Sequence, residues 1–241
     1  MGRALSFLTL FGRASAPNET TLVWFPVVGA VLGLVIGEIW WLAAKAWPPL
    51  TVAVVVVVAD LVLTGGLHFD GLADAGDGLL APLTKERRLQ AMSDPAVGAF
   101  GALSVVAVLL LRFTAFAGLR PAPLVLAGLW CASRTSMAII AETLPYARTT
   151  GIVQRFLGTS PRGARQRVFV LSASALGLLL AAGLVVLGRG ARGLWALVGE
   201  LAAMGAVAMF SWRRVGGFTG DVLGAAGVVG ETVGLMILVT R

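Results

Sequence analysis

The feature that most constrains this chain is its succession of long apolar segments. Each is close to the ~20 residues that a helix needs to cross a bilayer. The segments lie at 23–44, 50–66, 97–118, 122–143, 168–188, 193–211 and 222–240. Hydrophobic residues make up 58% of the chain and charged residues 13%, whereas a soluble domain carries about 45–50% and about 25%. We therefore predict an all-α, polytopic membrane helix bundle of about seven transmembrane helices, forming one domain over residues 1–241.

Lys and Arg are distributed unequally between the two sides of such a bundle. Twelve fall on the side of the N-terminus and five on the other side. Because cytoplasmic loops are enriched in Lys and Arg, we predict a plasma (inner) membrane protein with a cytoplasmic N-terminus. The longer loops, 67–96, 144–167 and 212–221, then also face the cytoplasm, and we expect the active site there. Loop positions account for the net charge of +7, so we predict no nucleic-acid partner.

The densest group of acidic residues lies in the first of these loops. Asp70, Asp74 and Asp77 have i, i+4, i+7 spacing, which places three carboxylates on one face of a helix. No Lys or Arg lies between Leu67 and Thr84 to offset their repulsion. A hard divalent cation such as Mg²⁺ is therefore the expected counter-charge, and the alternative is a solvated acidic turn. The chain has one cysteine and one histidine, which leaves carboxylates as the main ligands.

Further polar residues lie beside the apolar segments, and each has two interpretations. His68 is either a general base or phosphate contact, or a structural residue. Asp94, which precedes Pro95, either caps the third segment or binds substrate. Asp221 follows a run of glycines that ends at Gly220. It is either a helix cap or part of a glycine-rich loop whose N–H groups face phosphate.

Two arginines, Arg112 and Arg134, lie inside apolar segments. A charge at the bilayer centre costs roughly 2.5–3.5 kcal/mol on insertion scales, so such residues are functional by default. Either arginine pairs with Asp60 as a structural ion pair, or grips a phosphate group of a substrate.

The stretch 64–78, TGGLHFDGLADAGDG, resembles the signature of the adenosylcobinamide-GDP ribazoletransferase (cobalamin-5′-phosphate synthase) family. Three other segments resemble motifs of that family in the same order. They are FPVVG at 25–29, AMSD with VGAFG at 91–101, and GGFTGDVLGAA at 216–226, with Glu231 beyond the last. The resemblance covers nearly the whole chain, although 150–210 matches only in hydrophobic and basic character. Phe218 stands where a polar residue is common in the family.

This resemblance implies a phosphoryl-transfer reaction. A ribose hydroxyl of α-ribazole, or of α-ribazole 5′-phosphate, attacks the phosphorus of adenosylcobinamide-GDP nearest the corrinoid, and GMP leaves. Mg²⁺ is the implied cofactor, and the lipid bilayer that holds the enzyme is an implied partner. A homo-oligomer, or contact with other enzymes of the cobalamin pathway, stays open. The implied catalytic and metal-binding residues are Asp70, Asp74 and Asp77, with His68 as a further catalytic residue. The expected substrate-binding residues are Asp94, Arg112, Arg134, Gly220, Asp221 and Glu231.

Two other functions stay open at this point. CDP-alcohol phosphotransferases also carry spaced aspartates beginning at Asp-Gly, but their pattern needs an Asp three residues earlier and an Ala-Arg pair after it. Leu67 and Ala73-Asp74 stand at those places here. A transporter would place its charges near the midplane and often show an internal repeat, whereas the carboxylates here gather on one side.

Overall fold

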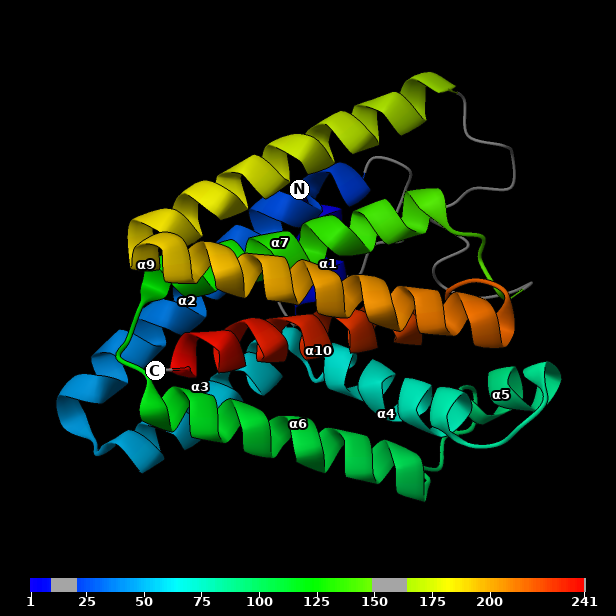
Figure 1. Cartoon of the computed structure of the whole chain (residues 1–241), viewed down its shortest axis with the longest axis horizontal. Coiled ribbons are helices and arrows are strands. Elements are labelled where there is room, and N and C mark those ends of the chain that lie inside the picture. Colours follow the sequence, from blue (N-terminus) through cyan, green and yellow to red (C-terminus); the bar gives the residue numbers. More distant parts are fainter. Residues whose placement is uncertain (10–20, 149–163, 241) are drawn as a thin grey trace.

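The computed structural model describes residues 1–9, 21–148 and 164–240, and the regular structure in this part of the chain is helical. A 3₁₀ turn at Leu22–Trp24 leads directly into the first long helix. The helices are α1 (Gly2–Leu8), α2 (Phe25–Ala46), α3 (Pro49–Thr64), α4 (Leu67–Leu80), α5 (Lys85–Ala91), α6 (Ala99–Gly118), α7 (Pro123–Thr143), α9 (Ala164–Val215) and α10 (Gly220–Val239). Figure 1 shows the long helices side by side in one bundle, with α5 at one end.

Five helices in the described part are long and apolar enough to cross a membrane, and the bent pair α3–α4 makes a sixth if it is one span. The predicted class, an all-α polytopic membrane bundle, is thus confirmed. All seven predicted segments overlap a helix or helix arm, but the number of crossings and their orientation stay predictions. Arg13, Arg155, Arg162 and Arg241, which enter the charge count, lie outside the described residues.

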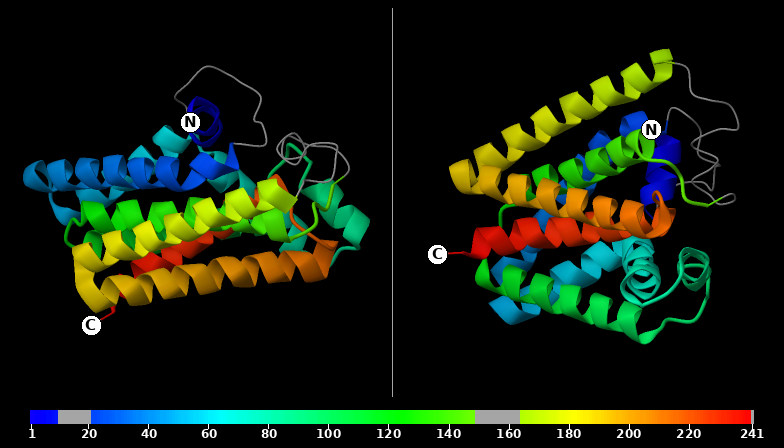
Figure 2. Two further views of the ribbon diagram at one scale, coloured as in Figure 1. Left: turned by 90° about the horizontal axis from the view of Figure 1, so that it is seen from above. Right: turned by 45° about the vertical axis from the view of Figure 1, so that its right-hand side comes forward.

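The fifth and sixth predicted segments both belong to α9. This helix is broken at Gly190, where φ is 58° and ψ is −138°. A positive φ is open to glycine at little cost, so the chain can reverse there. Figures 1 and 2 show the arm before Gly190 (yellow) and the arm after it (orange) running back along the bundle. The 52 residues of α9 therefore form two straight arms, each about as long as one membrane span.

The second predicted segment is too long at its end. The predicted range is 50–66, but α3 ends at Thr64 because Gly65 and Gly66 adopt left-handed backbone conformations, with φ of 62° and 68°. The chain bends by 90° at this point and continues as α4. The helix predicted from the spacing of the three aspartates is therefore present, and two glycines set its direction.

Helix α7 lies at the centre of the bundle. Its apolar stretch is 89% buried, and it contacts α2, α9 and α10. Glycines at every fourth position of 29–37 predict a close helix contact, and the structure confirms it. A Cβ atom added to Gly29 or Gly33 would collide with the backbone of α7 at Trp130 or Leu126. This tight core holds the ends of the neighbouring helices in fixed positions.

Candidate active site

Helix α4, which carries the three aspartates, lies at the end of the bundle where α10 and α6 begin (Figure 1). Asp70 is exposed, and Asp74 and Asp77 are partly buried. Small residues on the other faces let α4 approach its neighbours. A Cβ at Gly71 would lie 2.8 Å from the backbone oxygen of Asp221, and one at Gly76 would lie 2.8 Å from Ser104 Oγ. The helix is therefore packed between α10 and α6 while its carboxylates stay accessible.

Asp77 is the one of the three that contacts α6. Its Oδ2 accepts a hydrogen bond from the N–H of Gly98 at 2.7 Å, and its Oδ1 accepts one from the N–H of Gly101 at 2.9 Å. The alternative that Asp94 caps this helix is wrong, because the N-cap is Gly98. Asp94 is exposed, and its Oδ1 accepts a hydrogen bond from the N–H of Ala96, two residues further along, at 2.9 Å. Its role in substrate binding stays a prediction.

The start of α10 brings a fourth carboxylate to the same end. The N-cap is Thr219, whose Oγ1 accepts from the N–H of Val222 at 3.3 Å. The interpretation of Asp221 as the N-cap is therefore wrong, because the N-cap lies two residues earlier. The carboxylate of Asp221 accepts a hydrogen bond from Thr219 Oγ1 at 3.2 Å and lies 2.8 Å from Arg148 Nη2. Asp221 thus lies in the first turn of α10, partly buried and beside an arginine.

The glycine-rich loop before α10 is held by backbone pairing. The N–H of Phe218 donates to the carbonyl of Pro145 at 3.0 Å, and the N–H of Ala147 donates to the carbonyl of Phe218 at 2.9 Å. Gly217 lies so close to Pro145 that an added Cβ would collide with its carbonyl oxygen. The loop therefore connects the end of α7 to α10 and places Arg148 beside Asp221. The phosphate-contact role of Gly220, at the start of α10, stays a prediction.

Tyr146 lies in the same connection and packs edge-to-face on Phe218, with ring centroids 5.5 Å apart. Burial raises the pKa of the Tyr146 phenol above its ordinary value, and Arg148 opposes this shift while Asp221 adds to it. The hydroxyl is therefore protonated at neutral pH and can donate a hydrogen bond.

The charges around Asp74 are mostly of its own sign. Asp221, Asp70 and Asp77 repel its carboxylate, and Arg148 attracts it. Among the described residues, no three Asp, Glu, His or Cys side chains converge closely enough to hold a metal ion by themselves. Mg²⁺ in proteins often needs only one or two carboxylates, with substrate phosphates and water completing its shell. The hard oxygen donors of Asp70 and Asp74 fit that mode of binding.

A second group of charges is buried in the centre of the bundle. Arg112 of α6 lies 2.5 Å from Asp60 Oδ2 and 2.6 Å from Glu231 Oε2, and its side chain is 1% exposed. Its Nε donates to Thr232 Oγ1 at 2.9 Å. Asp60 also accepts from the indole N–H of Trp130 at 3.3 Å. The ion-pair interpretation of Arg112 is therefore confirmed, and one arginine joins α3, α6 and α10.

Arg134 of α7 completes this buried charge cluster. It forms an ion pair with Glu231 Oε1 and donates to Ser133 Oγ at 2.8 Å. Its partner is thus Glu231, not Asp60. The structure places Arg112, Arg134 and Glu231 inside the protein, where they contact one another. The substrate contacts expected of them stay predictions.

His68 lies closer to the buried charge cluster than its position in the acidic motif indicates. It is 5% exposed, and the positive charges of Arg134 and Arg112 act on it. Gly224 of α10 lies against its backbone, since an added Cβ would be 3.2 Å from the Cα of His68. His68 therefore points away from the solvent-accessible carboxylates of its own helix.

Sequence reasoning missed Glu200, which lies on the second arm of α9. Glu200 is fully buried, and neither carboxylate oxygen has a hydrogen-bond partner among the described residues. The signal was available, because Glu200 is an acidic residue inside the apolar segment 193–211. The pairing of Arg148 with Asp221 was also missed, since it depends on the loop before α10.

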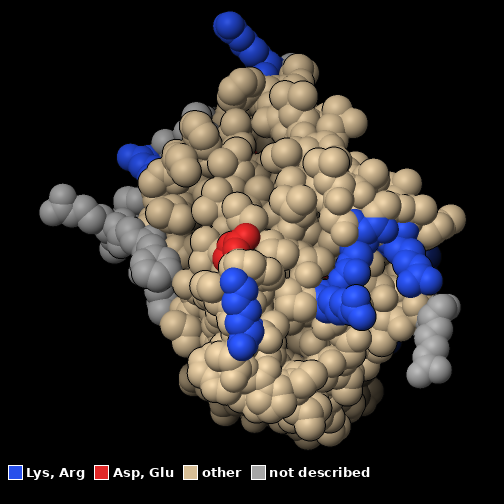
Figure 3. Space-filling view, turned by 90° about the vertical axis from the view of Figure 1, so that its left-hand side faces the viewer, with Lys and Arg blue, Asp and Glu red and all other residues tan. Residues whose placement is uncertain are grey.

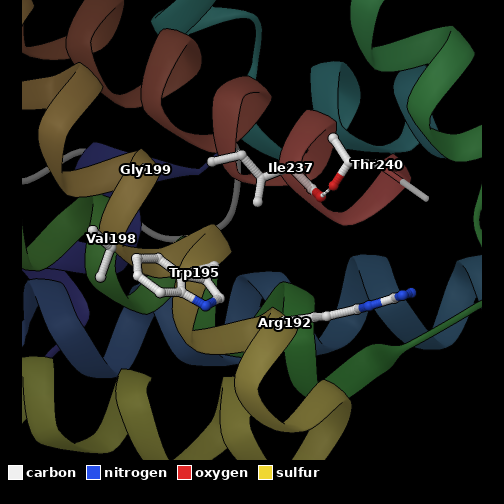
Figure 4. A pocket seen from close by; sticks show the side chains of 6 residues that line it. All are labelled: Arg192, Trp195, Val198, Gly199, Ile237 and Thr240. Carbon is white, nitrogen blue, oxygen red and sulfur yellow. Dashed lines mark hydrogen bonds between the residues drawn. The ribbon is translucent and has the colours of Figure 1, made fainter.

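A surface pocket of 380 Å³ lies at the opposite end of the bundle (Figure 4). It is lined by Arg192, Trp195, Val198, Gly199, Ile237 and Thr240. Ile237 and Thr240 lie at the far end of α10 from Asp221, and a helix of this length spans about 30 Å. Figure 3 shows that the charged side chains on this face are mostly Lys and Arg, spread over a surface of uncharged residues, with little acidic surface. The pocket is therefore separate from the carboxylates.

These features define a class: an all-helical, polytopic membrane protein with carboxylates gathered at one end of the bundle and ion pairs buried in its centre. The sequence profile of the cobalamin-5-phosphate synthase family matches residues 2–239. The chain belongs to this family.

Individual relatives agree over nearly their full length. The adenosylcobinamide-GDP ribazoletransferase of Chlorobium phaeovibrioides is 36% identical over 95% of this chain and 91% of its own. The protein of the same name from Chlorobaculum tepidum is 39% identical over 92% and 87%, and that of Brucella abortus is 38% identical over 89% and 84%. No solved structure matches this fold.

Proposed function

We propose that this protein transfers the phosphocorrinoid of adenosylcobinamide-GDP to a ribose hydroxyl of α-ribazole or its 5′-phosphate, releasing GMP. The family and the names of the relatives support this reaction class. The observation that carries the proposal is the state of Asp70 and Asp74. Neither carboxylate forms a hydrogen bond or ion pair with a described residue, whereas the carboxylates of Asp60 and Glu231 in the centre of the bundle are paired with arginines. Free carboxylates at the end of a bundle are available for substrate chemistry.

The reaction needs charge neutralisation more than covalent groups. In it the ribose oxygen forms a bond to the phosphorus nearest the corrinoid, and the bond from that phosphorus to the GMP oxygen breaks. Mg²⁺, when bound, supplies positive charge to the diphosphate. Asp70 and Asp74 are the side chains that would hold it, and Asp77 was predicted as a third ligand.

The proton of the attacking hydroxyl needs an acceptor that the substrate can reach. Asp70 is exposed and Asp74 is partly exposed, so we assign the acceptor to this pair of carboxylates. His68 fits this role less well, because it is buried beside two arginines. Arg148, held 2.8 Å from Asp221 at the edge of the site, is placed to bind a substrate phosphate.

Arg112, Arg134 and Glu231 support the site in a different way. Each is buried and paired, so we assign them to holding α6, α7 and α10 together beneath α4. A CDP-alcohol type of transfer would use the same free carboxylates with a different donor. The departures at Leu67 and Ala73-Asp74 argue against that donor.

The experiment is GMP release from adenosylcobinamide-GDP by the purified protein in detergent. The assay is run with and without α-ribazole, with Mg²⁺ or a chelator, and with a CDP-alcohol as a competing donor. We expect GMP only when acceptor and metal are both present. GMP release with the chelator would remove the metal proposal alone. Release of CMP from the CDP-alcohol, with no GMP release from adenosylcobinamide-GDP, would replace the proposed reaction.

We also propose that the carboxylate end faces the cytoplasm of a cell whose inner membrane holds the protein. The excess of Lys and Arg on that side supports this orientation. A reporter fused after Arg189, at the turn of α9, should report the non-cytoplasmic side. A fusion after Arg87 in α5 should report the cytoplasm, and the reverse result would invert the topology.

A further inference from the structure

Asp77 differs from the two other aspartates of α4, although all three share one face. Both of its oxygens are engaged, at 2.7 Å by the N–H of Gly98 and at 2.9 Å by the N–H of Gly101. These N–H groups belong to the N-cap and first turn of α6. Such groups have no partner within their own helix, and the helix dipole favours a negative charge there. The carboxylate of Asp77 is thus already balanced by protein.

The contact also depends on two glycines that could not be larger. A Cβ added to Gly98 would lie 2.5 Å from Asp77 Oδ1, and one added to Gly101 would collide with Asp77 Oδ2. An added Cβ at Gly101 would also lie 2.6 Å from the carbonyl oxygen of Ala73. The start of α6 therefore approaches α4 closely along the turn that links Asp74 to Asp77.

The end of α4 is fixed by a second contact. Arg88 of α5 is 4% exposed, and its Nη1 donates to the carbonyls of Gly78 and Leu79 at 2.9 Å and 2.8 Å. Those carbonyls are among the ones that a helix end leaves without internal partners. The half of α4 that carries Asp77 is thus held from both α6 and α5.

We propose that Asp77 is a positioning residue, which locks α4 onto the start of α6 so that the carboxylates of Asp70 and Asp74 keep a fixed orientation. It acts through these two residues and does not itself bind metal or substrate. This inference rests on the proposed function for its effect on turnover, but the lock itself is a property of the fold.

The test compares Asp77→Ala, Asp77→Asn and Gly101→Ala, with Glu86→Gln on the exposed side of α5 as control. Two readouts are taken on the full-length protein in detergent. The first is GMP release, with its kcat, KM and the Mg²⁺ concentration at half-maximal rate. The second is hydrogen exchange of the amides at the start of α6, which needs no activity.

A misplacement of about 1 Å can cost about 100-fold in rate, so we expect kcat of Asp77→Ala to fall by about 10–100-fold. The Mg²⁺ concentration at half-maximal rate should stay within about twofold of the parent. Asp77→Asn keeps one acceptor oxygen and should retain part of the rate. Gly101→Ala alters no ionisable group and should reproduce the loss, and each variant that loses rate should exchange the α6 amides faster.

Two results would overturn the proposal. One is a Mg²⁺ requirement raised about tenfold or more in Asp77→Asn with unchanged exchange, as expected of a metal ligand. The other is full activity of Gly101→Ala. If Asp77→Ala does not fold, the other two variants decide. If the parent itself releases no GMP, the proposed function fails, and the exchange data alone decide whether the lock exists.

Discussion

The carboxylate end and the buried charge cluster are built from the same residue types, acids and arginines, yet they differ in almost every physical respect. In the buried charge cluster, Asp60, Arg112, Arg134 and Glu231 are nearly inaccessible to solvent and paired across four helices. At the carboxylate end, Asp70 is exposed and Asp74 faces like charges. The ion pair there, Arg148–Asp221, has side chains that are each 21% exposed.

This difference indicates that separate sets of charged residues serve the stability of the fold and the proposed chemistry. A buried charge without a counter-charge is very costly in a low-dielectric interior, and each of the four charges of the buried charge cluster has a partner of opposite sign. A site for an anionic substrate and a cation must instead keep groups whose interactions are completed by ligands. We therefore assign the paired arginines to the framework, and the proposal assigns the unpaired Asp70 and Asp74 to the reaction.

The largest effect should come from breaking the framework. Arg112→Met leaves Asp60 buried without its cation, and we expect a loss of about 3–5 kcal/mol in the free energy of unfolding. Unfolding by denaturant in detergent measures this loss. The double variant Arg112→Met with Asp60→Leu removes both charges and should recover part of it. Equal stability of the parent and Arg112→Met would mean that the cluster contributes nothing to folding.

The second largest effect should be a loss of catalytic rate with little change in stability. Asp74→Asn keeps the size of the side chain but removes its charge, and we expect GMP release to fall by about 100-fold or more. The unfolding midpoint should stay close to that of the parent, because Asp74 makes no ion pair with a described residue. Glu86→Gln, on the exposed surface of α5, serves as the matched control. Normal turnover by Asp74→Asn would remove the proposed site.

The smallest effect should come from Arg148, which forms an ion pair with Asp221 at the carboxylate end of the bundle. Because the Arg148–Asp221 pair is partly exposed, Arg148→Gln should change stability by less than about 1 kcal/mol. Loss of a charged hydrogen bond to a phosphate should raise KM for adenosylcobinamide-GDP about tenfold. Steady-state kinetics measure this, with Arg87→Gln on α5 as control. An unchanged KM would leave Arg148 with only its contact to Asp221.

Much of the fold could be predicted because it depends on local properties of the sequence. Apolar length predicted the helices, the spacing of Asp70, Asp74 and Asp77 predicted α4, and a glycine repeat predicted that α2 has a close packing face, without its partner. The caps were predicted less well. Asp94 and Asp221 have the residue type of a cap, but Gly98 and Thr219 hold those positions. Cap identity depends on where the backbone turns, which is set by packing.

The sequence by itself determined the membrane class, the helices and the acidic motif, since hydrophobicity and periodicity are properties of neighbouring residues. Only the tertiary structure decided which charges are paired. The two acidic partners of Arg112 are 52 and 119 residues away, and Asp77 reaches amides 21 and 24 residues along the chain. Such partners meet only when the helices are packed, because burial makes pairing obligatory for some charges and leaves others free for ligands.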